Sequence, residues 1–483
     1  MTTATANQGE QRVLDGVPRG LFIGGEWGPA SGGGTLGVED PATGETLTEV
    51  ADAQVDDAVA ALDAAAAAQA GFAAMAPRER GEILRRAYER IVERADDLAL
   101  LMTLEMGKPV AESKAEVLYA ADFFHWFSGE ATRIDGRFSV AEKNSAQRVL
   151  VLRQPVGPCV FVTPWNFPLA MGTRKIGPQI AAGCTAVIKP AKQTPLSMLA
   201  LAGILEECGL PPGVLNVITA RSSSSVIEPL LQDPRTRKLS FTGSTEVGKL
   251  LMKQAADGLL RVSMELGGNA PFLIFDDADL DAAVEGAMLA KMRNVGEACT
   301  AANRFYAAES VAGPFAERLA ERMGQLKLGR GTEPDVRVGP LIDDDQRGKV
   351  DELVTDAADR GARVLVGAER VEGRGYFYRP TVLADVTDDA RLLREEVFGP
   401  VAPVRGFASE EEAIRAANDT EYGLVAYVYT SDLKRAFRVI EGLETGMVGL
   451  NQGVVSNASA PFGGVKQSGF GREGGREGIE EYV

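Results

Sequence analysis

A cysteine and a glutamate are the side chains of this chain best suited to chemistry. Cys299 lies in the run KMRNVGEACTAANRF, where the Gly-Glu-Ala-Cys setting is typical of a nucleophilic thiol with an acid partner. Glu265 lies in SMELGGNAPFLIF, directly before two glycines and an apolar, strand-like run. We expect both side chains to be buried. A buried thiol with a buried carboxylate indicates covalent chemistry.

The single histidine of the chain limits the kinds of catalysis open to that thiol. His125 lies in the aromatic run ADFFHWFSG, and a Cys-His or Ser-His relay would need it beside the nucleophile. We favour a histidine packed between aromatic side chains. The sequence contains no CxxC, no HExxH and no group of His with Cys or Asp at ligand spacing, so we expect no metal site.

Length, composition and charge indicate a large globular enzyme of two or three domains. The chain has 483 residues, 45% of them apolar, and no apolar run approaches the roughly 18 to 20 residues of a membrane span. We therefore expect no membrane partner. The formal charge of −17 argues against nucleic acid as a partner, and it means that local arginines must attract any anionic substrate.

The N-terminal segment and the cysteines bear on where the protein works. MTTATANQGEQ is polar and lacks a basic end followed by an apolar core, so we expect a disordered tail and no signal peptide. The four cysteines, at positions 159, 184, 208 and 299, are too scattered for a disulfide framework. This usage favours a reducing compartment, the cytoplasm.

Helical and strand patterns divide the chain into regions. Apolar residues at helical spacing predict helices over about 56–75 and about 78–109, and the pattern of 136–152 predicts an extended ribbon. From residue 159 on, short apolar runs ending in Pro, Gly, Ser or Thr alternate with helical patterns. Such alternation is typical of βαβ units in a parallel sheet, where ligands bind beyond the carboxyl ends of the strands.

Two strand ends in this alternation favour a dinucleotide site. Thr242–Gly248 follows the strand pattern KLSF and opens a helix, whose free N–H groups and positive dipole end suit an anion. A glycine turn alone is more often structural, and paired lysines are often solvated surface. Together, however, they favour a site in which Lys189 binds ribose hydroxyls and Lys192 meets a 2′-phosphate.

A second α/β unit follows Glu265. Helical spacing continues from about residue 275 to Gly296, just before Cys299, and later segments alternate again between strand and helix patterns. The thiol and its acid partner should then lie near the seam between the two halves, where pockets tend to form.

Seven motifs, in this order and at these distances, resemble the aldehyde dehydrogenase superfamily over nearly the whole chain. They are PWNFP, VIKPA, FTGSTEVG, ELGGNAP, GEACTAANR, EEVFGP and PFGGVKQSGFGRE. Within that superfamily the chain is most similar to succinate-semialdehyde dehydrogenases, in MELGGNAPFLIFDDADLDAAVEGAM and in the segment of Ser456 before PFGGVK.

The resemblance implies a mechanism for the reactive residues. Cys299 would attack the aldehyde carbon as a thiolate, and the oxyanion of the thiohemiacetal would be held by the side-chain amide of Asn166 and the main-chain N–H of Cys299. Hydride would then leave for a nicotinamide. Water activated by Glu265, whose burial should raise its pKa, would hydrolyse the remaining thioester.

The resemblance also implies a dinucleotide cofactor and its site. The surrounding residues would be Thr163, Pro164, Trp165, Lys189, Pro190, Ala191, Lys192, Gly243, Ser244, Gly248, Leu266, Glu396 and Phe398, with Glu396 on the nicotinamide ribose. NAD-preferring relatives commonly carry glutamate at the position of Lys192, which would repel a 2′-phosphate, whereas lysine attracts it. We therefore favour NADP, with NAD as the alternative cofactor.

Three residues match the positions that bind the distal carboxylate in succinate-semialdehyde enzymes. They are Arg174, Arg293 and Ser456. Two arginines converging on one carboxylate suit an acidic aldehyde and would disfavour an aminoaldehyde. The resemblance therefore implies oxidation of succinic semialdehyde to the dicarboxylate. Glutarate semialdehyde, or another small aldehyde, remains an alternative substrate.

The superfamily's architecture gives an expected division of the chain. We expect an α/β fold: a Rossmann-type parallel-sheet cofactor domain over 1–132 and 149–264, an α/β catalytic domain over 265–454, and a small β ribbon for oligomerisation. Segments 133–148 and 455–483 would serve oligomerisation or bridging. The chain ends at GIEEYV, short of the terminal strand that relatives use in subunit association, so we expect either a homodimer or a homotetramer.

Two positions near the thiol depart from the superfamily's pattern. Glu297 stands where glutamine is usual, and an acidic group there would raise the pKa of Cys299 if it pointed inward. Ala301 stands where some relatives carry a second cysteine, so we expect no disulfide switch.

Two further classes of protein remain to be weighed. A cofactor-free cysteine hydrolase or acyl-transferase would use Cys299 and Glu265 but leave Lys189, Gly243 and Glu396 without a task. A non-catalytic homologue would be expected to have lost one of its reactive residues, and none is lost.

Overall fold

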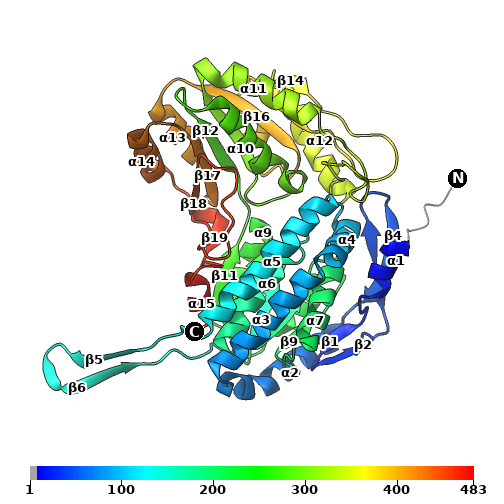
Figure 1. Cartoon of the computed structure of the whole chain (residues 1–483), viewed down its shortest axis with the longest axis vertical. Coiled ribbons are helices and arrows are strands. Elements are labelled where there is room, and N and C mark those ends of the chain that lie inside the picture. The colour runs from blue at the N-terminus through cyan, green and yellow to red at the C-terminus, as the bar shows by residue number, and fades with distance from the viewer. Residues whose placement is uncertain (1–7) are drawn as a thin grey trace.

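Two open sheets, each covered by helices on both faces, organise the computed structural model, which describes residues 8–483 (Figure 1). The first sheet has the order β19-β11-β10-β7-β8-β9-β1-β2. Its strands are β1 (Leu21–Ile23), β2 (Glu26–Gly28), β7 (Cys159–Val162), β8 (Ala186–Lys189), β9 (Leu215–Val217), β10 (Lys238–Thr242), β11 (Arg261–Glu265) and β19 (Gly469–Phe470). The five central strands are parallel, and their order is that of Rossmann-type folds.

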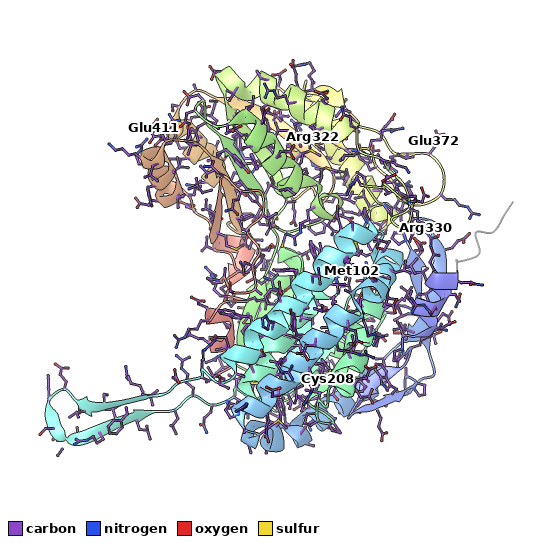
Figure 2. All side chains as sticks on the ribbon, viewed as in Figure 1. Met102, Cys208, Arg322, Arg330, Glu372 and Glu411 are labelled. Atoms are coloured by element: carbon purple, nitrogen blue, oxygen red, sulfur yellow. The ribbon has the colours of Figure 1, made fainter. Side chains whose placement is uncertain are left out.

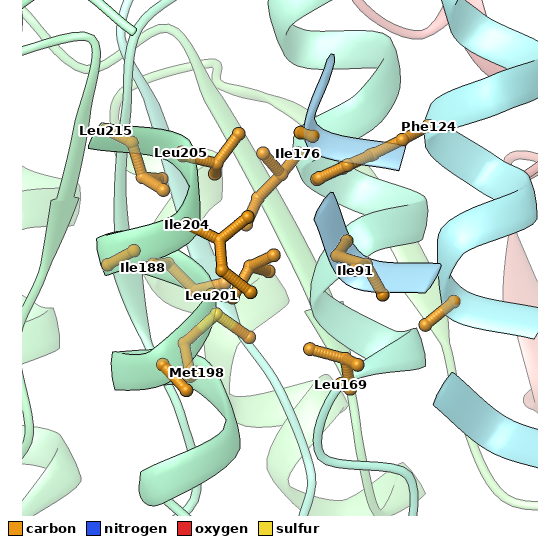
Figure 3. Close-up of a cluster of buried hydrophobic side chains, with 14 of the residues drawn as sticks. Ile91, Phe124, Leu169, Ile176, Ile188, Met198, Leu201, Ile204, Leu205 and Leu215 are labelled. Carbon is orange, nitrogen blue, oxygen red and sulfur yellow. The ribbon is translucent and has the colours of Figure 1, made fainter. Parts of the chain in front are cut away.

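Both faces of the first sheet are buried, as expected for a parallel sheet. On β7, Cys159 and Phe161 face one apolar cluster, and Val160 and Val162 face the other. The first cluster is covered by α3 (Pro77–Glu93), α4 (Ala95–Met106), α5 (Val110–Glu130), α6 (Ala170–Ala182) and α7 (Leu196–Glu207). The second is covered by α2 (Val55–Ala74), α8 (Ser223–Gln232) and α9 (Thr245–Asp257). Figure 3 shows the first cluster, with Leu201 of α7 facing Ile91 of α3.

The second sheet has the order β14-β15-β16-β13-β12-β17-β18, with only β14 antiparallel to its neighbour. Its strands are β12 (Ala270–Ile274), β13 (Ala302–Ala308), β14 (Arg363–Val366), β15 (Thr381–Ala384), β16 (Val401–Phe407), β17 (Val425–Tyr429) and β18 (Met447–Leu450). Phe272 faces α10 (Leu280–Met292), α11 (Glu309–Gly324) and α12 (Asp344–Asp359), and Leu273 faces α13 (Glu410–Asn418) and α14 (Leu433–Gly442).

Two hairpins and several short helices complete the chain. The hairpin of β3 (Thr35–Asp40) and β4 (Glu45–Ala51) contacts the second half through Arg330, labelled in Figure 2, which forms an ion pair of 2.9 Å with Asp40. The hairpin of β5 (Arg137–Ala141) and β6 (Asn144–Val151) projects away from the body (Figure 1). The short helices are α1 (Gln8–Asp15), η1 (Arg293–Gly296), η2 (Arg391–Leu393), η3 (Lys466–Ser468) and α15 (Glu477–Glu480).

The structure confirms the predicted fold class, the early helices, the extended ribbon and the βαβ alternation, but it corrects two boundaries. The predicted helix before Cys299 ends at Met292 and does not reach Gly296. The predicted tail is wrong for residues 8–11, which begin α1, and its remainder, 1–7, lies outside the described residues.

No single helix within residues 8–483 is long and apolar enough to cross a membrane. The helices Val55–Ala74 and Pro77–Glu93 meet the length and composition criteria only as a pair, which is bent by 115°.

Candidate active site

The strand order of the first sheet reverses between β7 and β10, and a cavity lies beyond the carboxyl ends of these two strands. Ligands of doubly wound sheets bind at such switch points. The cavity has a volume of about 220 Å³. Its lining residues are Pro164, Trp165, Asn166, Met171, Thr242, Gly243, Ser244, Leu266, Gly267, Cys299, Gln346, Lys349, Glu396 and Phe398. We name it the switch-point cavity. Residues of both halves of the chain line the switch-point cavity, as expected for a site between the two sheets.

Helix α9 presents its N-terminus to this cavity. Ser244 is its N-cap, and the Ser244 hydroxyl accepts a hydrogen bond from Val247 N–H at 3.4 Å. Gly248 lies in the first turn, where a Cβ would meet Leu266 at 2.4 Å. The glycine therefore lets α9 pack closely behind a cavity wall, and the helix end offers an anion free N–H groups.

The two lysines after β8 differ in environment. Lys189 is buried, and its ammonium donates to the Pro190 carbonyl at 2.9 Å. Burial, with Lys192 as a second cause, lowers the pKa of Lys189 to about 8. Lys192 is exposed and forms no ion pair with any residue of 8–483, so its charge is available to a ligand at this edge of the sheet.

Glu396 and Phe398 are held in place by helix α12. The Gln346 side-chain amide donates to the Phe398 carbonyl at 2.7 Å, and the Lys349 ammonium donates to the Glu396 carbonyl at 2.7 Å. The Glu396 carboxylate accepts from Gly268 N–H at 3.2 Å, and burial raises its pKa to about 7. Gln346 and Lys349 were not predicted. Their helical spacing on an exposed-looking segment gave no signal of a site.

The segment before Cys299 leaves the helix in an unusual conformation. Asn294 and Val295 have φ of 54° and 57°, in the left-handed region that a β-branched residue rarely adopts. Gly296 has φ of +79°, and a Cβ there would meet the Gly399 carbonyl oxygen at 2.2 Å. The close approach of these two main chains overrides the helical spacing, which explains the early end of α10.

Asn166 joins this segment to the first sheet. Its side-chain amide donates to the main-chain oxygen of Glu297 at 2.9 Å. The main-chain carbonyl of Asn166 accepts hydrogen bonds from the Lys108 ammonium at 2.9 Å and from the Asn294 side-chain amide at 3.0 Å. Asn166 and Cys299 both line the switch-point cavity, so the structure brings the predicted amide donor and the thiol together.

Cys299 is half-buried, less enclosed than expected, and Glu265 is buried as predicted. Burial raises the pKa of the Cys299 thiol to about 12, with Glu396 and Glu265 raising it further and Arg174 lowering it. Burial also raises the pKa of Glu265 well above its usual value, and Glu473 adds to this. Neither carboxylate oxygen of Glu265 has a hydrogen-bond partner within residues 8–483. Glu265 does not line the cavity.

Glu297 faces away from the thiol. One of its carboxylate oxygens accepts from Ile342 N–H at 3.1 Å, and its side chain is fully buried. Burial raises the pKa of Glu297 well above its usual value. The carboxyl that departs from the family pattern is thus bound to the main chain of Ile342, and the largest cause of the raised pKa of Cys299 is burial of the thiol.

A second cavity, of about 240 Å³, adjoins the first, since Phe167 lines it and the preceding Asn166 lines the switch-point cavity. Its lining residues are Lys108, Glu112, Ala115, Glu116, Tyr119, Phe167, Arg293, Asn294, Val454 and Ser456. We name it the Arg293 cavity. The Arg293 guanidinium lies 4.8 Å from the Phe167 ring centroid and forms no ion pair with any residue of the described chain. Arg293 and Ser456 are thus brought together.

Arg174 does not line either cavity. It lies on α6, 2% exposed, with its Nε 2.9 Å from a carboxylate oxygen of Glu473. Its guanidinium lies 4.0 Å from the Phe462 ring centroid. Glu473 also pairs with Lys175 at 2.6 Å. The predicted partner of Arg293 is therefore engaged by an internal carboxylate.

The predicted cofactor residues divide between the lining of the switch-point cavity and its surroundings. Seven predicted cofactor residues line the switch-point cavity: Pro164, Trp165, Gly243, Ser244, Leu266, Glu396 and Phe398. The others lie outside its lining: Thr163, Lys189, Pro190, Ala191, Lys192 and Gly248. Their roles stay predictions.

Histidine and the other cysteines lie away from both cavities. His125 is exposed and stacks on Tyr88 with ring centroids 4.6 Å apart, so the prediction of a histidine packed between aromatics is wrong. Cys159, Cys184 and Cys208 are buried and unpaired. No cluster of His, Cys, Asp and Glu suited to a metal occurs within residues 8–483.

The fold is a two-sheet α/β fold, and the Cys299 thiol lines a cavity at a strand-order switch point of the kind that binds dinucleotides. Residues 27–483 match the model of the aldehyde dehydrogenase family, and the chain belongs to that family of oxidoreductases. It is 58% identical over 437 residues to a succinate-semialdehyde dehydrogenase of Paenarthrobacter nicotinovorans, covering 90% of this chain and 97% of that protein.

Another relative and a solved structure are similar over almost the full length. A glutarate-semialdehyde dehydrogenase of Pseudomonas putida is 49% identical, covering 96% of this chain and 95% of that protein. The crystal structure of an NADP-dependent enzyme of Escherichia coli has a TM-score of 0.95 at 49% identity, covering 97% of each chain.

Proposed function

We propose that this protein oxidises succinic semialdehyde to succinate with NADP as the hydride acceptor. The observation that carries this proposal is the Arg293 guanidinium, which pairs with no carboxylate among residues 8–483 and shares a cavity with Ser456 next to the cavity of Cys299. An unpaired arginine beside a hydroxyl suits the distal carboxylate of an acidic aldehyde. The activities named for the relatives, on succinate and glutarate semialdehydes, support the same substrate class.

The reaction begins with Cys299. Its thiol sulfur attacks the aldehyde carbon, forming a thiohemiacetal whose oxyanion is stabilised by the Asn166 amide and the Cys299 N–H. Because burial raises the pKa of the thiol to about 12, the proton must pass to a nearby base as the sulfur attacks. Loss of hydride leaves a thioester on Cys299. Glu265 then takes a proton from the water that hydrolyses this thioester, which releases the dicarboxylate.

The switch-point cavity fits a nicotinamide dinucleotide. Its walls combine apolar surfaces from Pro164, Leu266 and Phe398 with the Glu396 carboxylate, which suits ribose hydroxyls. The N-terminus of α9 suits the pyrophosphate. When bound there, a nicotinamide would supply the hydride acceptor. The exposed Lys192 favours NADP by pairing with a 2′-phosphate, in agreement with the NADP dependence named for the Escherichia coli structure.

Arg174 remains a proposed second contact for the substrate carboxylate. Its guanidinium is paired with Glu473, so a substrate carboxylate would have to compete for it. Glutarate semialdehyde is a second candidate substrate, because one extra methylene changes the binding free energy by only about 1 to 3 kcal/mol. A cofactor-free hydrolase is not favoured, because it would leave the switch-point cavity without a ligand.

Hydride transfer itself is the test of this proposal. Purified protein is mixed with NADP and, in separate samples, with succinic semialdehyde, glutarate semialdehyde, an uncharged aldehyde and an aminoaldehyde. The near-ultraviolet absorbance of the reduced nicotinamide should rise fastest with the two acidic aldehydes. A flat trace with every aldehyde and with both NADP and NAD would reject the dehydrogenase function for this chain.

We also propose a homodimer or homotetramer in the cytoplasm. Its chain would comprise a dinucleotide-binding domain over 1–132 and 149–264 and a catalytic domain over 265–454, with 133–148 and 455–483 serving assembly or bridging. The projecting hairpin supports assembly, because Phe138 and Leu150 are 68% and 65% exposed there. The unpaired cysteines support a reducing compartment.

A further inference from the structure

Lys108 and Glu116 form an ion pair that is shielded from solvent. Both side chains are 1% exposed, and the Lys108 ammonium lies 2.5 Å from a Glu116 carboxylate oxygen. Lys108 lies just before α5, and Glu116 lies two turns into it. A buried pair is weak evidence for stability, because desolvation of the two charges offsets their attraction. The contacts that the two charges make with other segments indicate a different role.

Both members of this pair bind the segment that carries Asn166. The Lys108 ammonium donates to the Asn166 carbonyl at 2.9 Å. The second carboxylate oxygen of Glu116 accepts from Leu169 N–H at 3.0 Å and from Ala170 N–H at 3.1 Å. Residues 166–170 are thus held at both ends by one buried pair of charges.

The same helix also holds the segment that carries Cys299. Glu112, one turn before Glu116, accepts a hydrogen bond of 2.6 Å from Asn294 N–H. The Asn294 side-chain amide then donates to the Asn166 carbonyl and to the Glu297 carbonyl, at 3.0 and 2.9 Å. Since Asn294 has a left-handed conformation, these contacts fix a strained main chain five residues before Cys299.

We propose that Lys108 and Glu116 are positioning residues that set the Asn166 side-chain amide for oxyanion binding. This inference rests on the proposed function. The Lys108 ammonium binds the main-chain carbonyl of Asn166 and so fixes the main chain of this residue. The side-chain amide of the same residue donates to the segment that carries Cys299. An oxyanion donor contributes roughly 100- to 1,000-fold to rate, and a misplacement of about 1 Å can cost about 100-fold, so the pair acts on the rate without touching substrate.

The test removes both charges together, so that neither member of the pair is left buried without the other. Lys108→Met/Glu116→Gln is compared with Lys114→Met/Asp96→Asn, which removes an exposed ion pair of 2.6 Å between α5 and α4. With succinic semialdehyde and NADP, we expect the first variant to lower kcat roughly 10- to 100-fold, with NADP affinity within about twofold of the wild type. The exposed-pair variant should keep the wild-type kcat.

A double-mutant cycle separates positioning from a general effect on the fold. If Lys108 and Glu116 act through Asn166, then removing both charges in an Asn166→Ala background should change kcat by less than about twofold. The proposal is overturned if the two losses multiply, if the charge removal leaves kcat unchanged in the wild-type background, or if it weakens NADP binding as much as it lowers kcat.

A second variant covers the case in which the first does not fold. Lys108→Gln/Glu116→Gln keeps a polar donor near the Asn166 carbonyl but shortens its reach, and it should lower kcat in the same direction, again only when Asn166 is present. An unchanged kcat in this variant also overturns the proposal. If the wild type forms no reduced nicotinamide with any aldehyde, the proposed function fails first and the positioning role fails with it. An active wild type with unaffected variants rejects the positioning role alone.

Discussion

The side-chain amide of Asn166 donates a 2.9 Å hydrogen bond to the main-chain oxygen of Glu297, two residues before the Cys299 thiol. Asn166 follows β7 of the first sheet, whereas Glu297 precedes β13 of the second. One hydrogen bond therefore spans the seam at which the switch-point cavity lies. The relative placement of thiol and amide depends on how the two sheets dock.

Replacing Glu297 with glutamine should stabilise the protein at alkaline pH and leave turnover unchanged. Burial raises the pKa of Glu297, so the stability that this carboxyl contributes is present below the usual glutamate pKa and is lost as pH rises through the folded-state pKa. Between the usual glutamate pKa and the folded-state pKa, the free energy of unfolding of the wild type falls by about 1.4 kcal/mol per pH unit relative to the variant. Thermal unfolding from about pH 5 to about pH 9 measures this.

The exposed Glu317 supplies the control for that experiment. Glu317→Gln, on α11, should show no growing difference from the wild type as pH rises. A Glu297→Gln protein that is less stable than the wild type at about pH 8, or whose kcat falls more than about threefold, would contradict this prediction.

The Cys299 thiol of the ligand-free protein should react slowly and with a steep pH dependence. Burial raises its pKa to about 12, so the thiolate fraction, and with it alkylation by iodoacetamide, should rise about tenfold per pH unit from about pH 7 to about pH 9. Because Glu396 also raises this pKa, Glu396→Gln should speed alkylation at fixed pH. Peptide mass spectrometry of the Cys299 peptide gives the rate.

Glu395→Gln is the matched control for Glu396→Gln. Glu395 is the adjacent residue, and its carboxylate pairs with Arg391 at 2.8 Å on the surface. The control substitution should leave the alkylation rate unchanged. A rate that levels off below about pH 9, or slower alkylation in Glu396→Gln, would mean that the thiol is activated in the free protein.

Lys192→Glu should reverse the preference between the two dinucleotides. Loss of a charge-assisted contact costs about 1.5 to 3 kcal/mol, so NADP affinity should fall roughly 10- to 100-fold while NAD binding is kept or improved. Fluorescence titration with each dinucleotide measures the two affinities. Lys253→Glu, an exposed change on α9, is the charge-matched control. Equal losses for NADP and NAD would show that Lys192 does not contact the 2′-phosphate.

The projecting hairpin should hold subunits together. Phe138→Ser/Leu150→Ser removes two side chains that are more than half exposed in the single chain and should yield smaller particles in light scattering. Val364→Ser/Leu433→Ser, two exposed apolar residues of the other half, should not. An unchanged particle mass in the hairpin variant would remove this segment from the interface.

Strand-terminal motifs made much of this site predictable from sequence. Pro164, Gly243 and Glu265 follow or end apolar runs, and a parallel sheet gathers such positions at one edge. The family resemblance then supplied residues that no local pattern marks, such as Glu396 and Ser456. The Rossmann-type order of the first sheet agrees with both.

Features set by docking between distant segments were not predictable in this way. Asn294 and Val295 continue a helical pattern, yet the close approach of Gly296 to Gly399 forces them out of the helix. Gln346 and Lys349 contact the Glu396 segment only because α12 packs beside it. Arg174 and Glu473 likewise lie far apart in the sequence, and no local pattern predicts that they form an ion pair.

Recognition of a carboxylate by Arg293 is the central claim, and a ratio of specificity constants tests it most directly. We compare kcat/KM for succinic semialdehyde and for butanal, which has the same chain length and no charge, in the wild type, in Arg293→Met and in the surface control Arg318→Met. The wild type and the control should prefer the acid strongly, and Arg293→Met should reduce that preference roughly 100-fold while butanal turnover stays within a fewfold. Equal kcat/KM for the two aldehydes in the wild type, or an unchanged ratio in Arg293→Met, would contradict the account.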